Sequence, residues 1–201
     1  MKLVGPWFSG YTRRVGISLK LLDIPFEHLS FNAYLQKDEV AQFNPMVKVP
    51  ALVLDDGEIL FDSGSIVDYL DELVGPTRAL TPVSGADRRA VLRIVGISSA
   101  IYGKLSQIYD ESLRAEPLQS VELSAGFLHQ AITGFAMLEA RADDGWMVAD
   151  TLSQADIMAV ITFQAASRGQ LGTEVNAKTF PVLDSLADRA MALTSFSTTL
   201  A

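Results

Sequence analysis

Residues 44–63 read NPMVKVPALVLDDGEILFDS. Asn44-Pro45 is a turn signal, and the apolar run from Pro50 to Leu54 is typical of a strand. Asp55-Asp56-Gly57 has the composition of a hairpin turn, and Glu58 to Phe61 follows as a short partner strand. Asp62-Ser63 then offers a helix cap. The stretch therefore predicts a turn, an antiparallel hairpin and the start of a helix.

Before the hairpin, the sequence alternates between strand-like and helix-like patterns. Strands are predicted at residues 2–5 and 24–29, and helices at 12–22 and 34–43. A further helix is predicted at 63–74, which gives the order β-α-β-α-β-β-α. The first βαβ crossover predicts a parallel pair of strands, whereas the hairpin predicts an antiparallel pair.

After the hairpin, the chain changes character. The Gly- and Pro-containing residues that follow residue 75 form the best linker, so we predict a first domain at 1–75 and a linker at 76–84. Residues 85–201 show no convincing strand and are predicted to form an all-helical domain. Its helices are expected at 85–114, 121–138, 154–169 and from residue 181 onward.

Composition excludes several classes of function. The 201 residues carry a formal net charge of −8, so nucleic acid is not an expected partner. There is no cysteine, which removes disulfides, thiolate metal sites and cysteine nucleophiles. His28 and His129 lack metal-ligand spacing, so no metal is expected. No apolar run has the roughly 18–20 residues of a membrane span and no secretory signal is present, which favours a cytoplasmic protein without a membrane partner.

Three short motifs precede predicted elements, and each has an ordinary structural explanation. Ser9 comes just before the first helix, where serine is a preferred cap. Val49-Pro50 leads into a strand as part of a turn. Asp62-Ser63 caps the 63–74 helix, but a helix N-terminus also favours a carboxylate ligand. A hydroxyl and an acidic side chain there could hold both charged groups of an amino acid.

A fourth motif lies in the helical half. Residues 152–157 read LSQADI, a capping box with Asp156 in place of the commoner Glu or Gln. Leu152 and Ile157 occupy the two positions of a hydrophobic staple. The motif specifies how a buried helix begins and offers no reactive group.

In this order and spacing, the four motifs resemble the cytosolic glutathione transferase superfamily, and most closely its serine-type bacterial members. The resemblance covers essentially the whole chain and rests on residues 9–14, 44–52, 61–70 and 152–157. It implies an α+β thioredoxin-like N-terminal domain followed by an all-α domain, with glutathione as cosubstrate and usually a homodimer. The family also has cysteine-type members, which form a mixed disulfide with glutathione, and the absence of cysteine argues against that type here.

The resemblance also assigns roles to residues. Pro50 is expected to be cis, so that the backbone of Val49 pairs with the cysteinyl unit of glutathione. Asp62 and Ser63 are expected to hold the γ-glutamyl end, and Ser9 to donate a hydrogen bond to the sulfur. A free thiol has a pKa near 8.5, and a hydrogen bond to its charged form lowers that value. Serine is too weak a base to take the proton itself.

Two features of the loop around Ser9 depart from the family pattern or compete with it. Gly10 stands where close relatives often have proline, which loosens the loop. Tyr11 is a rival hydroxyl two residues away, because other classes use a tyrosine near this region. We favour Ser9 as the residue that contacts the sulfur, with Tyr11 lining a second pocket.

The second substrate, a hydrophobic electrophile, is expected in an apolar pocket between the domains. Its candidate lining residues are Trp7, Phe8 and Tyr11 from one side and Tyr102 and Tyr109 from the other, although an aromatic stripe at helical spacing is usually core.

Lys37 and Lys48 are candidates for the glycyl carboxylate of glutathione. Arg13 and Arg14 are expected at the surface. So are the arginines of the 85–114 helix, some of which could face Asp68 or Asp71 across a dimer interface.

Three functions share these residues. The first is an enzyme that adds glutathione to an electrophile or reduces a peroxide with it. The second is a binding or regulatory protein on the same fold, because fold alone does not decide activity. The third is a glutathione-dependent isomerase or dehalogenase. Retention of Ser9, Val49-Pro50 and Asp62-Ser63 together favours an intact glutathione site.

Overall fold

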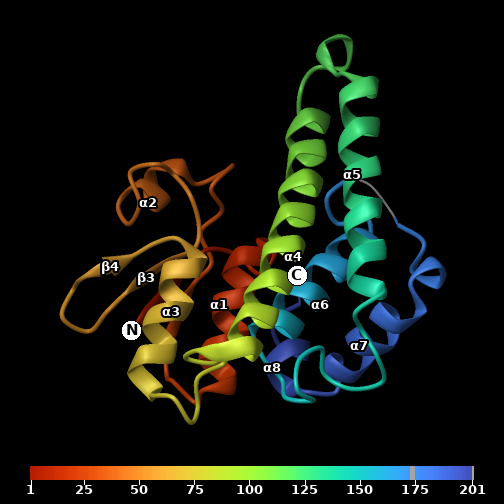
Figure 1. Cartoon of the computed structure of the whole chain (residues 1–201). Helices are drawn as coiled ribbons and strands as arrows, with labels where there is room; N and C mark the ends of the chain where they lie inside the picture. The colour runs from red at the N-terminus through yellow and green to blue at the C-terminus, as the bar shows by residue number, and fades with distance from the viewer. Residues whose placement is uncertain (173–174, 201) are drawn as a thin grey trace. The chain divides into compact units, whose positions relative to one another are not determined.

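A computed structural model describes residues 1–172 and 175–200 of the chain (Figure 1). The chain divides into two compact units. Unit 1 comprises Met1–Val83 together with the C-terminal segment that begins at Met191, and unit 2 comprises Ser84–Ala190. Unit 1 contains a small mixed sheet with helices, and unit 2 is helical, which agrees with the predicted α+β domain followed by an all-α domain.

The sheet of unit 1 has four strands in the order β2-β1-β3-β4. These strands are β1 (Lys2–Val4), β2 (Glu27–Leu29), β3 (Ala51–Val53) and β4 (Ile59–Leu60). β1 pairs in parallel with β2, and β3 pairs antiparallel with both β1 and β4. The parallel crossover and the antiparallel hairpin predicted from the sequence are therefore both confirmed.

Three helices of unit 1 follow the predicted pattern: α1 (Gly10–Leu21), α2 (Lys37–Ala41) and α3 (Ser63–Val74). α1 and α3 pack against each other and against β1 and β3. The centres of their apolar faces are buried, with Ile17 and Leu19 of α1 and Ile66 and Leu70 of α3 at 0% exposure. Because α1 and α3 share one core, the residues at their N-termini are held in a fixed geometry.

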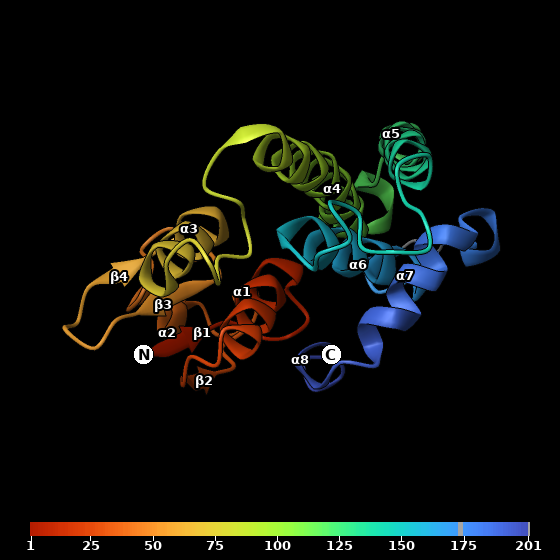
Figure 2. The ribbon, with the colours of Figure 1, turned by 60° about the horizontal axis from the view of Figure 1, so that its bottom comes forward.

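The C-terminal end of the chain joins unit 1 rather than the helical unit. The short helix α8 (Thr194–Ser197) packs on α1, as Figure 2 shows. Arg13 of α1 donates from Nε to Thr199 Oγ1 (3.4 Å) and from Nη2 to the carbonyl oxygen of Phe196 (3.5 Å). Arg13 is 4% exposed and Phe196 is 0% exposed. The predicted helical domain extended to residue 201, but the segment from Met191 belongs to unit 1, where Arg13 binds it and Phe196 is buried.

Unit 2 contains α4 (Gly85–Ser112), α5 (Val121–Glu139), α6 (Gln154–Ser167) and α7 (Pro181–Met191), with short 3-10 turns at Glu116–Leu118 and Ala177–Thr179. α6 is buried along almost its whole length. It begins with the predicted capping box: the Asp156 carboxylate accepts from the N–H of Met147 (2.8 Å), the N–H of Ser153 (2.9 Å) and Ser153 Oγ (3.0 Å). The motif at 152–157 is thus structural, as expected.

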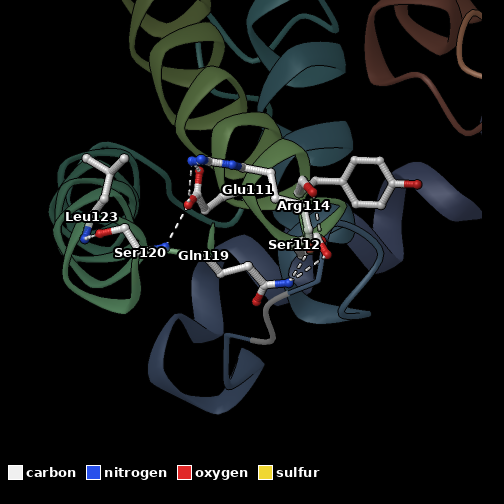
Figure 3. A network of polar contacts seen from close by, with 7 residues as sticks. Glu111, Ser112, Arg114, Gln119, Ser120 and Leu123 are labelled. Carbon is white, nitrogen blue, oxygen red and sulfur yellow. Dashed lines mark hydrogen bonds and ion pairs between the residues drawn. The ribbon is translucent and has the colours of Figure 1, made fainter. Parts of the chain in front are cut away.

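α4 and α5 form an antiparallel pair whose tip is tied by a polar network (Figure 3). The Glu111 carboxylate accepts from Arg114 Nη1 at 3.1 Å and from the N–H of Ser120 at 2.6 Å. Ser120 Oγ in turn accepts from the N–H of Leu123 (3.2 Å), which caps α5. Donors from both sides of the turn thus converge on the single carboxylate of Glu111, which fixes the path of the chain from α4 into α5.

The linker is anchored to α3 by one carboxylate. Asp71 accepts from the N–H groups of Leu80 (2.7 Å) and Thr81 (3.0 Å). Burial raises the pKa of Asp71, and these hydrogen bonds oppose that rise. Both oxygens of Asp71 thus accept from the linker within unit 1, and its pairing with an arginine of another copy stays a prediction. In the described part of the chain, no helix is long and apolar enough to cross a membrane.

Candidate functional site

Ser9 lies at the N-terminus of α1 and caps it, as the sequence predicts. Its Oγ accepts a hydrogen bond from the N–H of Thr12 at 3.4 Å, and its own N–H donates to the carbonyl oxygen of Pro6 at 3.0 Å. The hydroxyl therefore acts as an acceptor toward the helix, and its proton remains able to point away from it. A half-buried hydroxyl in this state can donate to a negatively charged atom placed above the helix end.

The loop before β3 comes close to the same helix through Gly5. Gly5 has a φ of +130°, a conformation that favours glycine. A Cβ on Gly5 would lie 2.8 Å from Cβ of Val49 and would also collide with Oγ1 of Thr12. Gly5, Thr12 and Val49 are therefore in direct contact, which places Val49 beside the first turn of α1.

Asn44 organises the loop that presents Val49. Its side chain is 1% exposed, donates from Nδ2 to the carbonyl oxygen of Lys48 (3.1 Å) and accepts at Oδ1 from the N–H of Met46 (3.0 Å). The Val49–Pro50 bond is cis, as the resemblance implied. The sequence marks Asn44 only as part of a turn signal. Asparagine side chains commonly form hydrogen bonds with the backbone of their own turn, as Asn44 does here.

Asp62 and Ser63 form the N-terminus of α3. Oδ1 of Asp62 accepts from the N–H of Gly64 (2.7 Å) and the N–H of Ser65 (3.3 Å). The side chain is exposed, and both capping bonds use the same oxygen, so Oδ2 faces no donor in the described hydrogen bonds. Ser63 is 5% exposed, and its Oγ accepts from Arg14 Nη1 at 3.4 Å, which leaves its proton to donate.

Arg14 corrects an expectation from the sequence. It was expected at the surface, but it is 6% exposed and lies beneath the start of α3. Burial lowers the pKa of Arg14 to about 10, while the nearby negative charge of Asp62 acts to raise it. The guanidinium therefore stays charged at neutral pH and places a positive charge beside Asp62 and Ser63. No local signal in the sequence marks Arg14 as buried, because its burial depends on α3, which follows much later in the chain.

The electrostatics also bear on the choice between the two hydroxyls. Burial raises the pKa of Tyr11, and Asp62 adds to the rise, whereas Arg14 opposes it. Tyr11 is thus a neutral phenol at neutral pH and cannot accept a proton from a thiol. Toward a thiolate, both Ser9 and Tyr11 act as hydrogen-bond donors, and neither can serve as the base.

The three predicted parts of the site thus meet around a single helix. Ser9 caps α1, Val49 contacts the Gly5–Thr12 pair at its first turn, and Arg14 one turn later binds Ser63 of α3. The arrangement offers a hydroxyl donor, the backbone of half-buried Val49 just before β3, and a helix N-terminus with one carboxylate. Such a set suits an extended peptide-like ligand with a negatively charged sulfur and an amino acid end.

The lysines and the α4 tyrosines predicted from the sequence make no described contact with Ser9, Val49 or the Asp62–Ser63 pair. Lys37 at the start of α2 and Lys48 before Val49 are both exposed. Tyr102 is 4% exposed within the long helix α4, and Tyr109 on the same helix is half-buried. Their shared role in a second-substrate pocket stays a prediction.

Trp7 has packing partners inside unit 1. Its ring stacks on His28 with centroids 3.8 Å apart, and it lies against Gly16 of α1. Phe8 is half-buried in the same loop. His28, which the sequence offers only as a possible metal ligand, is instead the stacking partner of this ring. In the residues that the structure describes, no group of three or more His, Asp or Glu side chains is arranged to hold a metal ion.

Comparison with known proteins gives the family. Residues 3–78 match the family described as glutathione S-transferase, N-terminal domain. The glutathione S-transferase-like protein YibF of Escherichia coli K12 is 32% identical over 157 residues, 78% of this chain and 77% of its own. A maleylacetoacetate isomerase of Pseudomonas aeruginosa is 29% identical over 98% of this chain and 93% of its own.

A solved structure extends the likeness to the whole chain. The glutathione S-transferase of Methylobacillus flagellatus KT with bound glutathione superposes with a TM-score of 0.91 at 25% identity, over 99% of this chain and 98% of that one. The sheet order, the cis bond before β3 and the helical second unit fit the same fold. This chain therefore belongs to the glutathione S-transferase family.

Proposed function

We propose that this protein is an enzyme that binds glutathione on unit 1 and activates its thiol for attack on an electrophilic or peroxide substrate. The observation that carries the proposal is the meeting of Ser9, Val49 and the Asp62–Ser63 pair around α1. The bound glutathione in the Methylobacillus flagellatus relative supports the same ligand.

The γ-glutamyl end of glutathione would be held at the N-terminus of α3. Oδ2 of Asp62 is the acceptor for the ammonium group, because Oδ1 is occupied by the capping bonds. The hydroxyl of Ser63 is the donor for the carboxylate, since Arg14 already donates to its oxygen. The charge of Arg14 and the positive end of the α3 dipole both favour that carboxylate.

The sulfur would lie near Ser9, with the backbone of Val49 pairing with the cysteinyl unit. At a thiol pKa near 8.5, only a few per cent of glutathione is thiolate at pH 7. A hydrogen bond donated by Ser9 stabilises the thiolate and lowers that pKa, and each unit corresponds to about 1.4 kcal/mol. The proton leaves to water. Ser9 is favoured over Tyr11 because its proton is free to turn from the helix, as its oxygen already accepts from Thr12.

The glycyl carboxylate of glutathione and the second substrate would need contacts beyond those of Ser9, Val49 and Asp62–Ser63. Lys37 and Lys48 are the cations nearest in sequence to the cis loop and would bind the glycyl carboxylate. On unit 1, Phe8 and Tyr11 would contact a hydrophobic electrophile. We place the protein in the cytoplasm with a role in detoxification, because that compartment keeps glutathione reduced.

A glutathione-dependent isomerase is the second candidate. The Pseudomonas aeruginosa relative, named a maleylacetoacetate isomerase, is similar over nearly the whole chain. An isomerase would use the same thiolate, so the site does not distinguish the two reactions. A panel of electrophiles, peroxides and cis-unsaturated dicarboxylates would separate them.

We also propose that the protein is a homodimer that associates through α4 and α5. Between these helices lies a groove of about 680 Å³ whose floor includes Ile97, Ile101 and Met137, with Gly96 and Ala100 allowing close approach. Met137 is 43% exposed on α5. Analytical ultracentrifugation tests this, and Met137→Glu should shift the protein toward a monomer.

The experiment that tests the proposed function is calorimetric titration with reduced glutathione. Wild-type protein should bind, and Asp62→Ala should bind much more weakly because the ammonium loses its partner. Ser9→Ala should retain affinity but turn over about tenfold more slowly at neutral pH, because the thiol pKa rises by about one unit. Absence of binding by the wild type at millimolar glutathione would contradict an enzyme and favour a non-catalytic protein on the same fold.

A further inference from the structure

The loop that carries Ser9 lies between two glycines, Gly5 and Gly10, and a glycine places little restraint on the backbone. Residues 5–9 connect β1 to α1, and the one proline among them, Pro6, fixes φ three residues before Ser9 and not at Ser9 itself. A hydroxyl must be held to within about 0.5 Å to stabilise a thiolate effectively. Something else must therefore fix the loop.

His28 contacts this loop at two points. Its Nε2 lies 2.7 Å from the carbonyl oxygen of Gly5, and because a carbonyl only accepts, Nε2 carries the proton and donates. Its ring is stacked on Trp7, with an interplanar angle of 21°. His28 lies in β2 opposite Leu3 of β1, so its backbone is fixed by the parallel strand pairing.

Trp7 is held from the other side by α1. A Cβ on Gly16 would lie 2.6 Å from Cη2 of Trp7, so the indole rests directly on the helix backbone at that glycine. The ring is therefore held between His28 and α1. Trp7 is two residues before Ser9, whose N–H donates to Pro6 in the same loop.

We propose that His28 is a positioning residue for Ser9. It holds the start of the loop through Gly5 and its middle through Trp7, and thereby fixes the direction of the Ser9 hydroxyl. His28 does not touch glutathione. The proposal rests on the proposed function, in which Ser9 donates to the sulfur.

The test is the pH–rate profile of conjugation at saturating glutathione in full-length variants. His28→Phe keeps a flat ring for Trp7 but loses the N–H, and His28→Leu loses both. Because loss of one hydrogen bond misplaces the donor without removing it, the midpoint of the profile should rise by about half a unit to one unit. The rate at high pH should be unchanged, since glutathione is then a thiolate without help. A merely structural role would lower the rate at every pH.

A second variant reaches the loop without changing His28. Gly16→Ala pushes the Trp7 ring away from α1 and should raise the midpoint in the same direction. Phe31→Leu is the matched control, because it breaks the Phe31–Phe43 aromatic pair, with centroids 6.2 Å apart, elsewhere in unit 1. Its profile should match the wild type.

A double variant separates this proposal from the proposed function. If His28 acts only through Ser9, Ser9→Ala with His28→Phe should have the same midpoint as Ser9→Ala alone. Suppose that both His28→Phe and Gly16→Ala have wild-type midpoints while Ser9→Ala has a raised one. That result would overturn the proposed role of His28 and leave the proposed role of Ser9 intact. An unchanged midpoint in Ser9→Ala would overturn both proposals.

Discussion

Replacing Asp62 separates two roles that one carboxylate performs. Oδ1 of Asp62 caps α3 through Gly64 and Ser65, whereas Oδ2 is proposed to bind the ammonium of glutathione. Asp62→Ser keeps a capping oxygen and removes the charge. Asp62→Ala removes both. The pair of variants therefore tests binding independently of helix stability.

The expected magnitudes differ for the two variants. Loss of an N-cap costs about 1 kcal/mol, which lowers Tm by about 2–4 °C for a chain of this size. A hydrogen bond to a charged group contributes about 1.5–3 kcal/mol, so loss of the ammonium contact weakens glutathione binding by roughly 10- to 100-fold. Asp62→Ala should show both effects, and Asp62→Ser only the loss of affinity.

Two assays are needed on the same samples. Calorimetry with reduced glutathione gives Kd, and thermal unfolding without ligand gives Tm. Ser65→Ala is a suitable control, because its backbone N–H still donates to Asp62. Asp62→Ser with wild-type affinity would refute the assignment of the ammonium site, and a loss of affinity only in Asp62→Ala would reduce Asp62 to a helix cap.

Three further predictions concern stability. Asp156→Ala leaves two buried donors on Ser153 unpaired, and also the half-buried N–H of Met147. At about 1 kcal/mol or more for each buried donor, the free energy of unfolding should fall by at least about 2 kcal/mol in denaturant titration. A fall below about 1 kcal/mol would contradict the described network. Hydrogen bonds from the N–H of Ser120 and, to a smaller extent, from Arg114 lower the pKa of Glu111 from its usual 4.5. The contribution of Glu111 to stability is therefore present above pH 4.5 and is lost as the pH falls through the lowered pKa. Glu111→Gln should remove this acid sensitivity from hydrogen exchange at the α4–α5 tip, and equal acid profiles would argue against it. Arg13→Ala should raise hydrogen exchange around Phe196, whereas protection equal to the wild type would show that Arg13 does not hold the tail.

The order of elements was predictable because local signals agree with the final fold. The Asp55–Gly57 turn between two apolar runs became the β3–β4 hairpin, and the capping box at Ser153 began α6. The hydrogen bonds of these motifs join residues that are only a few positions apart, so the motifs can be recognised without knowledge of the tertiary structure. The same holds for Ser9 and Asp62 as helix caps.

Long-range packing was not predictable in the same way. Nothing local distinguishes Arg13 and Arg14 from surface arginines, since their burial depends on α8 and α3, which lie far away in the sequence. His28 has the same difficulty, because its partners Gly5 and Trp7 are brought to it by strand pairing. Polar residues whose partners come from another element are therefore the part of the site that the sequence hides.

The thiol pKa of bound glutathione tests the proposed role of Ser9 most directly. Titration of thiolate absorbance in the ultraviolet, with saturating glutathione, gives this pKa for the wild type, Ser9→Ala and Tyr11→Phe. A hydrogen bond from Ser9 predicts a wild-type value well below the free thiol and a rise of about one unit in Ser9→Ala, with little change in Tyr11→Phe. An unchanged pKa in Ser9→Ala, with a rise in Tyr11→Phe, would contradict the proposal and assign the sulfur to the phenol.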